Sequence, residues 1–174
     1  GNFECSKKII ELLVEKDPKQ DFALPFIRAA SEGNIDICQY FIDQKLTIDY
    51  DQLSNSVFDL GSVSKKLFIL VVENANKSLR DLFLLRSLQP AILKRNFELV
   101  DYLLSQKVPY ENILFDAVNS HDVEMVETIL KNNDKPSFVN RRTENGSALF
   151  YAARNNDIPI IKRLLAVPGI DINL

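Results

Sequence analysis

The sequence predicts an all-α protein, a solenoid of about four to five repeated helix–turn–helix pairs. Two distant segments, RAASEGNIDICQYFI at 28–42 and YAARNNDIPIIKRLL at 151–165, share one pattern of paired alanines, a polar turn and an aliphatic run. Two further copies of this pattern, AILKRNFELVDYLL and AVNSHDVEMVETIL, begin at Ala91 and Ala117. A single repeat cannot bury its own apolar face, so four copies indicate an array in which neighbours cover one another.

The second helix of each repeat is predicted from an apolar stripe. When the copies are aligned on the alanines at 29, 91, 117 and 152, apolar residues recur at spacing i, i+3, i+6 and i+7, which is one face of an α-helix. A strand would instead alternate every two residues. The four aligned columns are Ile35/Phe97/Val123/Ile158, Cys38/Val100/Val126/Ile161, Phe41/Leu103/Ile129/Leu164 and Ile42/Leu104/Leu130/Leu165.

The first helix and the turn are predicted from the columns on either side of the anchor. An apolar column three residues before it favours a first helix: Phe26, Leu88, Leu114 and Leu149. An acid or a proline suits the start of each second helix: Asp36, Glu98, Glu124 and Pro159. Between the helices the chain must reverse, often through a left-handed residue, which Gly33 and Asn156 adopt more readily than Arg95 and His121.

The anchor spacings of 62, 26 and 35 residues indicate how many repeats there are. The first spacing is close to two periods of 31, so we expect a degenerate repeat with its anchor at Val71 and an extra helical turn in the residues before it. Its second helix carries Leu79, Leu82, Phe83 and Leu84, and the connection that follows must be very short. We expect one array over 1–174, a piece of a longer chain, with repeats at 1–20 (partial), 21–50, 51–86 (degenerate), 87–108, 109–140 and 141–174.

Several motifs resemble the ankyrin repeat, whose signature is T-P-L-H-x-A. SALFYAA at 147–153 stands in for that signature and LPFIRAA at 24–30 is a weaker match. TENGS at 143–147 resembles the tip of the family's β-hairpin finger, and GIDIN at 169–173 resembles the G-A-D-V-N that leads into one. The resemblance covers most of 21–174 and includes a helix remnant at 7–16.

The chain also departs from the ankyrin pattern. The histidine of T-P-L-H is absent from every repeat, and Pro90 falls inside a first helix. The 26-residue spacing leaves no room for a full finger before Ala117. We therefore expect short or missing fingers in the middle of the array.

The resemblance implies a protein-binding surface, because partners of ankyrin repeats contact the finger tips and two exposed residues near the end of each first helix. The corresponding residues here are Ser31, Glu32, Leu93, Lys94, Asn119, Ser120, Arg154 and Asn155, with Thr143, Glu144 and Gly146 in the finger. Leu93 is apolar at a position expected to face solvent, so it is either a partner anchor or a sign that the register is miscounted. The alternative for all these residues is an ordinary solvated surface, with Leu93 buried by the degenerate repeat.

Composition argues against several other classes. The net charge of −3 and the pI of about 5.3 show no footprint for nucleic acid or for an anionic membrane. No apolar run approaches the ~18 residues of a spanning helix. Cys5 and Cys38 are too few for a disulfide framework and are expected to be small buried residues of a cytoplasmic protein.

The sequence offers no set of residues for catalysis or for a cofactor. The single histidine, His121, has no second ligand at metal-binding spacing, and no glycine-rich phosphate loop or nucleophile–base pair is visible. The segment NRRTENG at 140–146 could hold a phosphate or an acidic peptide, although a solvated loop is the favoured interpretation. We expect no enzymatic activity, no cofactor and no metal.

The function that follows is a monomeric protein–protein interaction module that presents a concave face to a partner of unknown identity. The alternative is a substrate-positioning domain of a larger enzyme whose catalytic domain lies outside these residues, and a structural spacer is a weaker third idea. The many Asn, Lys and Ile residues suggest an AT-rich genome, and hence an effector of a parasite or intracellular bacterium that acts on host proteins.

Overall fold

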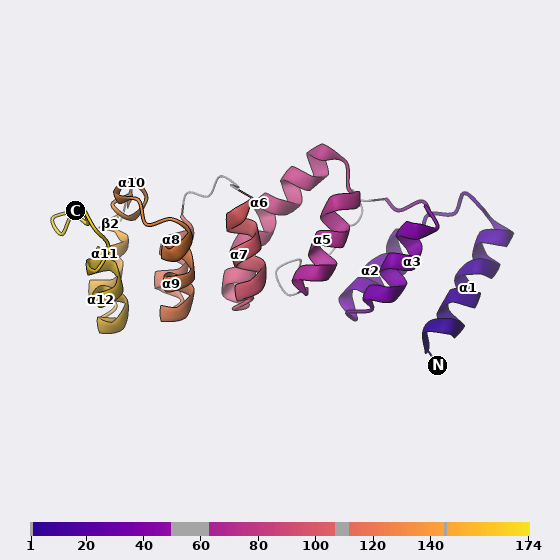
Figure 1. Cartoon of the computed structure of the whole chain (residues 1–174), viewed down its shortest axis with the longest axis horizontal. Helices are drawn as coiled ribbons and strands as arrows, with labels where there is room; N and C mark the ends of the chain where they lie inside the picture. Colours follow the sequence, from indigo (N-terminus) through magenta and orange to yellow (C-terminus); the bar gives the residue numbers. More distant parts are fainter. Residues whose placement is uncertain (1, 50–62, 107–111, 145) are drawn as a thin grey trace. The chain divides into compact units, whose positions relative to one another are not determined.

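The computed structural model describes residues 2–49, 63–106, 112–144 and 146–174 (Figure 1). The chain divides into two compact units, which we call the N-terminal half, Gly1–Leu84, and the C-terminal half, Leu85–Leu174. Each half is helical and is considered by itself. The all-α class expected from the repeated stripe is confirmed.

The described residues of the N-terminal half include one complete helix pair, two further helices and the beginning of α6 (Lys77–Leu93). Helices α2 (Ala23–Ser31) and α3 (Ile35–Asp43) form the pair, and α3 also packs against α1 (Asn2–Lys16) and α5 (Lys65–Asn74). The expected helix remnant at 7–16 is therefore part of a longer helix. The extra turn expected before the degenerate repeat falls mostly on residues 50–62, which lie outside the described residues.

A single helix, α6 (Lys77–Leu93), replaces two elements expected from the sequence. The second helix of the degenerate repeat and the first helix of the next were expected to be separated by a short connection, and that expectation was wrong. No glycine and no capping residue followed by a turn interrupts the segment RDLFLLRSLQ, so nothing stops the helix there. Pro90 lies inside it, as expected, and removes one backbone hydrogen bond without ending the helix.

The C-terminal half consists of helix pairs that share one arrangement. Helix α7 (Phe97–Ser105) packs against α9 (Val123–Asn132), and α9 packs against α12 (Ile158–Leu165). In the row of first helices, α8 (Ile113–Asn119) packs against α11 (Ala148–Arg154) (Figure 1). The first helices α8 and α11 each pair with their own second helix and contact one another.

Small anchor residues permit the close packing of the first helices. The alanines at 91, 117 and 152 are 0% exposed, and Ala29 in the other half is 6% exposed. Alanine carries only a methyl group, so two helix backbones can approach closely at these positions. The anchor alanine of each copy therefore marks a packing position, whereas Ala153, the second alanine of the last pair, is exposed.

The buried stripe of the second helices differs from the expected one at its first column, and its last column is buried only at Leu104 and Leu130, while Ile42 is half-buried and Leu165 is 47% exposed. The column at Ile35/Phe97/Val123/Ile158 is half-buried or exposed. The true stripe instead begins two residues later, with Leu99, Met125 and Ile160 each 0% exposed. The first helical residue after the turn still borders solvent, whereas the residue two positions on is covered by packed helices. The columns at Cys38 and Phe41 belong to the core as expected, although Ile161 in the former column is only half-buried.

The turns between paired helices all use one left-handed residue. Gly33, Arg95, His121 and Asn156 have φ values of 72°, 56°, 57° and 55°. In each turn the next residue donates its backbone N–H to the carbonyl of the anchor alanine, as Asn96 N does to Ala91 O at 2.9 Å. This is the Schellman pattern of helix termination, and it confirms the reversal expected at these four positions.

The residue after each left-handed residue is the N-cap of the second helix, and in all but Asn34 its side chain accepts a backbone hydrogen bond. Asp122 Oδ1 accepts from Met125 N at 3.1 Å, Asp157 Oδ1 accepts from Ile160 N at 3.3 Å, and Asn96 Oδ1 accepts from Leu99 N at 3.3 Å. These side chains are N-caps, which satisfy backbone donors that the helix leaves unpaired. The sequence interpretation missed them, because it assigned the start of the helix to the acids two residues later.

One short finger precedes α11. Strands β1 (Arg142–Thr143) and β2 (Gly146–Ser147) pair antiparallel, after the short helix α10 (Pro136–Val139). Ser147 accepts from Phe150 N at 3.2 Å, so the finger ends on the N-cap of α11. The finger expected at 143–147 is confirmed, while the missing finger expected before Ala117 falls on 107–111, outside the described residues.

The GIDIN segment lies beside this finger. Asn140 Nδ2 donates to Gly169 O at 2.8 Å, and Asp171 N donates to Asn140 Oδ1 at 2.9 Å. Ser147 Oγ also donates to Leu174 O at 3.1 Å. The end of one repeat is thus tied by hydrogen bonds to the preceding repeat.

Candidate functional site

The structure places the expected partner-binding residues at two ends of the first helices. Leu93, Lys94, Asn119 and Ser120 lie at the turn end of their helices and are exposed, while Arg154 and Asn155 hold the same position on α11. The finger residues Thr143, Glu144 and Gly146 precede α11, at its opposite end. Ser31 and Glu32 occupy the equivalent turn end of α2 in the N-terminal half and are also exposed.

Leu93 is 62% exposed, which excludes its burial by the degenerate repeat. It is not a core residue covered by the degenerate repeat, so it is an apolar side chain presented to solvent near the end of α6. Its neighbour Ile92 is only 1% exposed, because Ile92 points into the packed side of the same helix. The register assigned from the sequence is therefore correct at this position.

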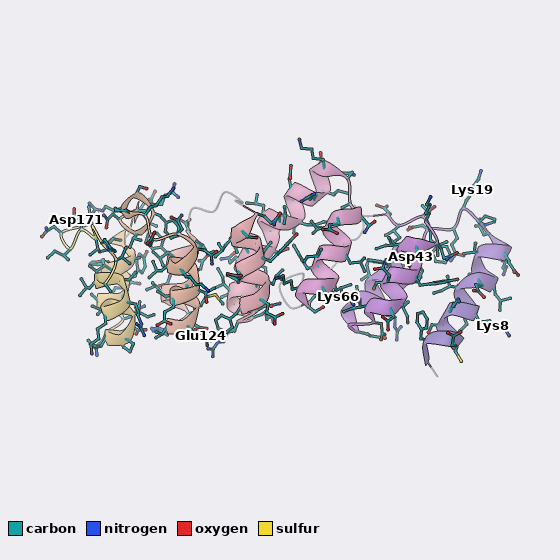
Figure 2. The ribbon with its side chains drawn as sticks, in the orientation of Figure 1. Lys8, Lys19, Asp43, Lys66, Glu124 and Asp171 are labelled. Atoms are coloured by element: carbon teal, nitrogen blue, oxygen red, sulfur yellow. The ribbon has the colours of Figure 1, made fainter. Side chains whose placement is uncertain are left out.

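A hollow of about 420 Å³ joins the ends of α6 and α8 to the start of α9. Ile92, Leu93 and Val123 form its apolar wall, and Ser120, His121 and Glu124 contribute polar atoms. Figure 2 shows Glu124 at the turn end of the α8–α9 pair. Of the expected residues, the structure brings Leu93 and Ser120 together in this hollow.

Arg95 lines the hollow and forms ion pairs with two acidic residues on its polar side. Its Nε lies 2.7 Å from Asp122 Oδ2, and Nη2 lies 3.8 Å from Glu124 Oε2. The guanidinium also lies 5.7 Å from the ring centroid of Phe97, a distance at which a cation attracts the ring face. The Asp122 side chain is 7% exposed and that of Arg95 is 63% exposed, so the ion pair has a buried anionic end and an exposed cationic end.

The same contact recurs one repeat later. His121 Nδ1 lies 3.2 Å from Asp157 Oδ2, so the left-handed residue of one turn again reaches the N-cap of the next repeat. Neither contact was expected, because the sequence interpretation treated Arg95 and His121 only as awkward turn residues. A sequence signal that could have identified these contacts is a basic residue at the left-handed turn position of one repeat together with an aspartate at the N-cap position of the next repeat.

Burial changes the chemistry of two further side chains. Loss of solvent raises the pKa of the Asp116 carboxyl on α8, and a hydrogen bond with Gln89 partly opposes that shift. Burial raises the pKa of the Cys38 thiol to about 12, so this thiol is protonated and poorly nucleophilic at neutral pH. Cys38 is 0% exposed as expected, whereas Cys5 is exposed on α1 and the expectation that it is buried was wrong.

Within the described ranges, no group of three or more His, Cys, Asp or Glu side chains is arranged to hold a metal ion. None of the helices in those ranges is both long and apolar enough to cross a bilayer. NRRTENG is partly built into the finger, with Arg142 and Thr143 in β1. Its Thr143 Oγ1 donates to Gly146 O at 3.2 Å, which closes the finger on itself.

Paired helices with left-handed turns, capped second helices and a short finger define a helical repeat protein of the class that binds other proteins. A family model for ankyrin repeats, in three copies, matches residues 88–174, half of the chain. The chain belongs to the ankyrin repeat family. No curated protein and no solved structure gives a significant match.

Proposed function

We propose that the chain is a protein-binding module whose partner contacts the turn ends of the first helices and the finger before α11. One observation carries this proposal: Leu93, an exposed apolar residue, borders a hollow whose other wall is polar and charged. Apolar anchors beside polar rims are typical of protein interfaces.

The variation among repeats supports the same surface. The turn-end positions hold Leu and Lys in one repeat, Asn and Ser in the next and Arg and Asn in the last, while the buried columns stay apolar. Arg154 lies 4.6 Å over the Tyr151 ring, which orients a cation beside this surface. A monomeric state and a host-directed role remain predictions. Identification of the partner tests the host-directed role.

Reversing three turn-end charges is expected to weaken binding of the partner. The test variant carries Glu32→Lys, Lys94→Glu and Arg154→Glu, all at exposed positions, so we expect its melting temperature to stay within a few degrees of the parent. A partner identified by cross-linking to the parent chain would be titrated against both proteins. We expect at least a tenfold loss of affinity, because like charges then face each other across the interface.

A matched control variant distinguishes the effect of charges on this surface from the effect of the protein's net charge. Glu98→Lys, Lys131→Glu and Lys162→Glu make the same net change on exposed positions of the second helices. Binding by this control should equal that of the parent. Equal loss in both variants, or retained binding by the test variant, would contradict the proposed surface.

A further inference from the structure

The turn end of α11 carries a cation that a buried ring holds in place. The Arg154 guanidinium carbon lies 4.6 Å from the centroid of the Tyr151 ring, one turn back on the same helix. Tyr151 is 9% exposed, and its ring packs edge to face against Phe115 of α8 and Phe150, at centroid distances of 5.6 and 6.3 Å. Because this stacked arrangement restricts the Arg154 side chain in the free protein, binding costs it less conformational entropy.

The acidic residues near this cation are engaged elsewhere. Asp116 of α8 shares a side-chain hydrogen bond with Gln89. Asp157 is the N-cap of α12, and its Oδ2 lies 3.2 Å from His121 Nδ1. Among the residues that the structure describes, no carboxylate forms an ion pair with Arg154. Its N–H donors are therefore open to solvent and to a ligand.

Asn119 of α8 supplies a second donor at the adjoining position. Two contacts bracket Asn119 and Arg154 in the chain: the Phe115 and Tyr151 rings meet before them, and the turn after α8 meets the N-cap of α12 after them. Both contacts join the same two repeats in the same order, so α8 and α11 run in one direction with their turn ends side by side (Figure 1). Asn119 is exposed, and within the described ranges its amide takes part in no hydrogen bond.

This pair of donors indicates the chemistry of the ligand. A guanidinium presents parallel N–H groups that match the two oxygens of a carboxylate, and the neighbouring amide can donate a further hydrogen bond. Arg154 is the single cation in α8 and α11, and one positive charge suits a monoanion. A phosphate group, with a charge of about −1.5 to −2 at pH 7, would remain partly unpaired here.

We propose that Arg154 and Asn119 bind the carboxylate of an aspartate or glutamate side chain of the partner protein. This inference rests on the proposed function, since it assigns the partner's chemistry at one part of the same surface. Neither residue lines the hollow beside Leu93. The carboxylate site and the hollow can therefore be tested by separate substitutions.

The probe is a phage-displayed library of random peptides, selected on the complete 174-residue chain. We expect peptides selected on the parent to share a motif with Asp or Glu at one position. Selection on the Arg154→Glu chain should replace that acid by Lys or Arg, because the preferred charge follows the residue at position 154. An unchanged preference for either charge would overturn the proposal, as would a parent selection without acidic enrichment.

The most enriched parent peptide is then labelled and titrated against each variant by fluorescence anisotropy. We expect Arg154→Gln to weaken binding about tenfold, and Arg154→Lys about threefold, because lysine keeps the charge but loses the planar donor pair and the ring stack. Asn119→Ala should weaken binding about threefold through the lost hydrogen bond. Lys162→Gln removes the same charge at an exposed position of α12 and should leave the affinity unchanged.

Peptide variants identify the group that is bound. Replacing the peptide's acid by its amide should weaken binding to the parent about tenfold but cause no further loss on the Arg154→Gln chain, because the two changes remove one contact. Tighter binding of a phosphoserine peptide, by about tenfold or more, would overturn the assignment to a carboxylate.

Leu93→Ser separates a failure of this inference from a failure of the proposed function. If Arg154→Gln leaves the affinity unchanged while Leu93→Ser lowers it, the carboxylate site is wrong and the turn-end surface stands. If neither change lowers the affinity, both the carboxylate site and the turn-end surface are contradicted.

Discussion

Replacing Leu103 by alanine is expected to lower the free energy of unfolding by about 2–5 kcal/mol. Leu103 is 0% exposed in α7, within the stripe that packs against α9. Truncation removes buried apolar surface and leaves a cavity that the neighbouring helices fill only in part. Denaturant unfolding followed by circular dichroism at 222 nm measures the change.

Leu93→Ala is the matched control, because it removes the same atoms from a side chain that is 62% exposed. We expect its effect on the free energy of unfolding to stay within about 0.5 kcal/mol. A similar loss in the two variants would show that the stripe is not the core. It would then contradict the packing of α7 against α9.

The second large effect is expected for Asp122→Ala, with a loss of about 2 kcal/mol in the free energy of unfolding. The change removes the N-cap acceptor for Met125 N, at 3.1 Å, and the buried anionic partner of Arg95, at 2.7 Å. Arg95 itself is largely exposed, so water compensates part of the loss on that side. Thermal and denaturant unfolding measure the effect.

Asp157→Ala separates the two contributions. Asp157 caps α12 through Ile160 N at 3.3 Å, but it contacts His121 rather than an arginine. We expect a loss of about 1 kcal/mol there, the ordinary magnitude for a helix N-cap. If Asp157→Ala costs as much as Asp122→Ala, the Arg95 contact contributes nothing measurable to stability.

Much of the fold could be predicted from the sequence, because the helices and turns of each repeat are determined by residues close together in the chain. The left-handed turns at Gly33, Arg95, His121 and Asn156 follow from the four aligned copies, and each has the expected φ sign. Their hydrogen bonds to the anchor alanines are also local. Local patterns of this kind are read without knowledge of distant contacts.

The continuous helix α6 shows where the repeat period gives a wrong prediction. The repeat period demanded a break before residue 88, but a helix ends only where its residues stop it or tertiary packing does. No stop signal lies between Asp81 and Gln89. The repeat period therefore predicted a break in the helix, whereas the residues in this segment favour a continuous helix.

The contacts between successive repeats could not be predicted from a single repeat. Arg95 and Asp122 are 27 residues apart and meet only when two repeats stack. The same stacking creates the hollow beside Leu93. The positions of the candidate binding residues were predictable from one repeat, whereas their shared hollow depends on two.

The proposed binding surface is tested most directly by hydrogen–deuterium exchange of the chain with and without its identified partner. We expect added protection at residues 92–95, 119–124, 142–143, 146–147 and 153–156, which hold the turn ends of the first helices and the finger strands in the C-terminal half. The outward parts of α9 and α12 should exchange at unchanged rates. Protection confined to α9 and α12, with none at the turn ends, would contradict the account.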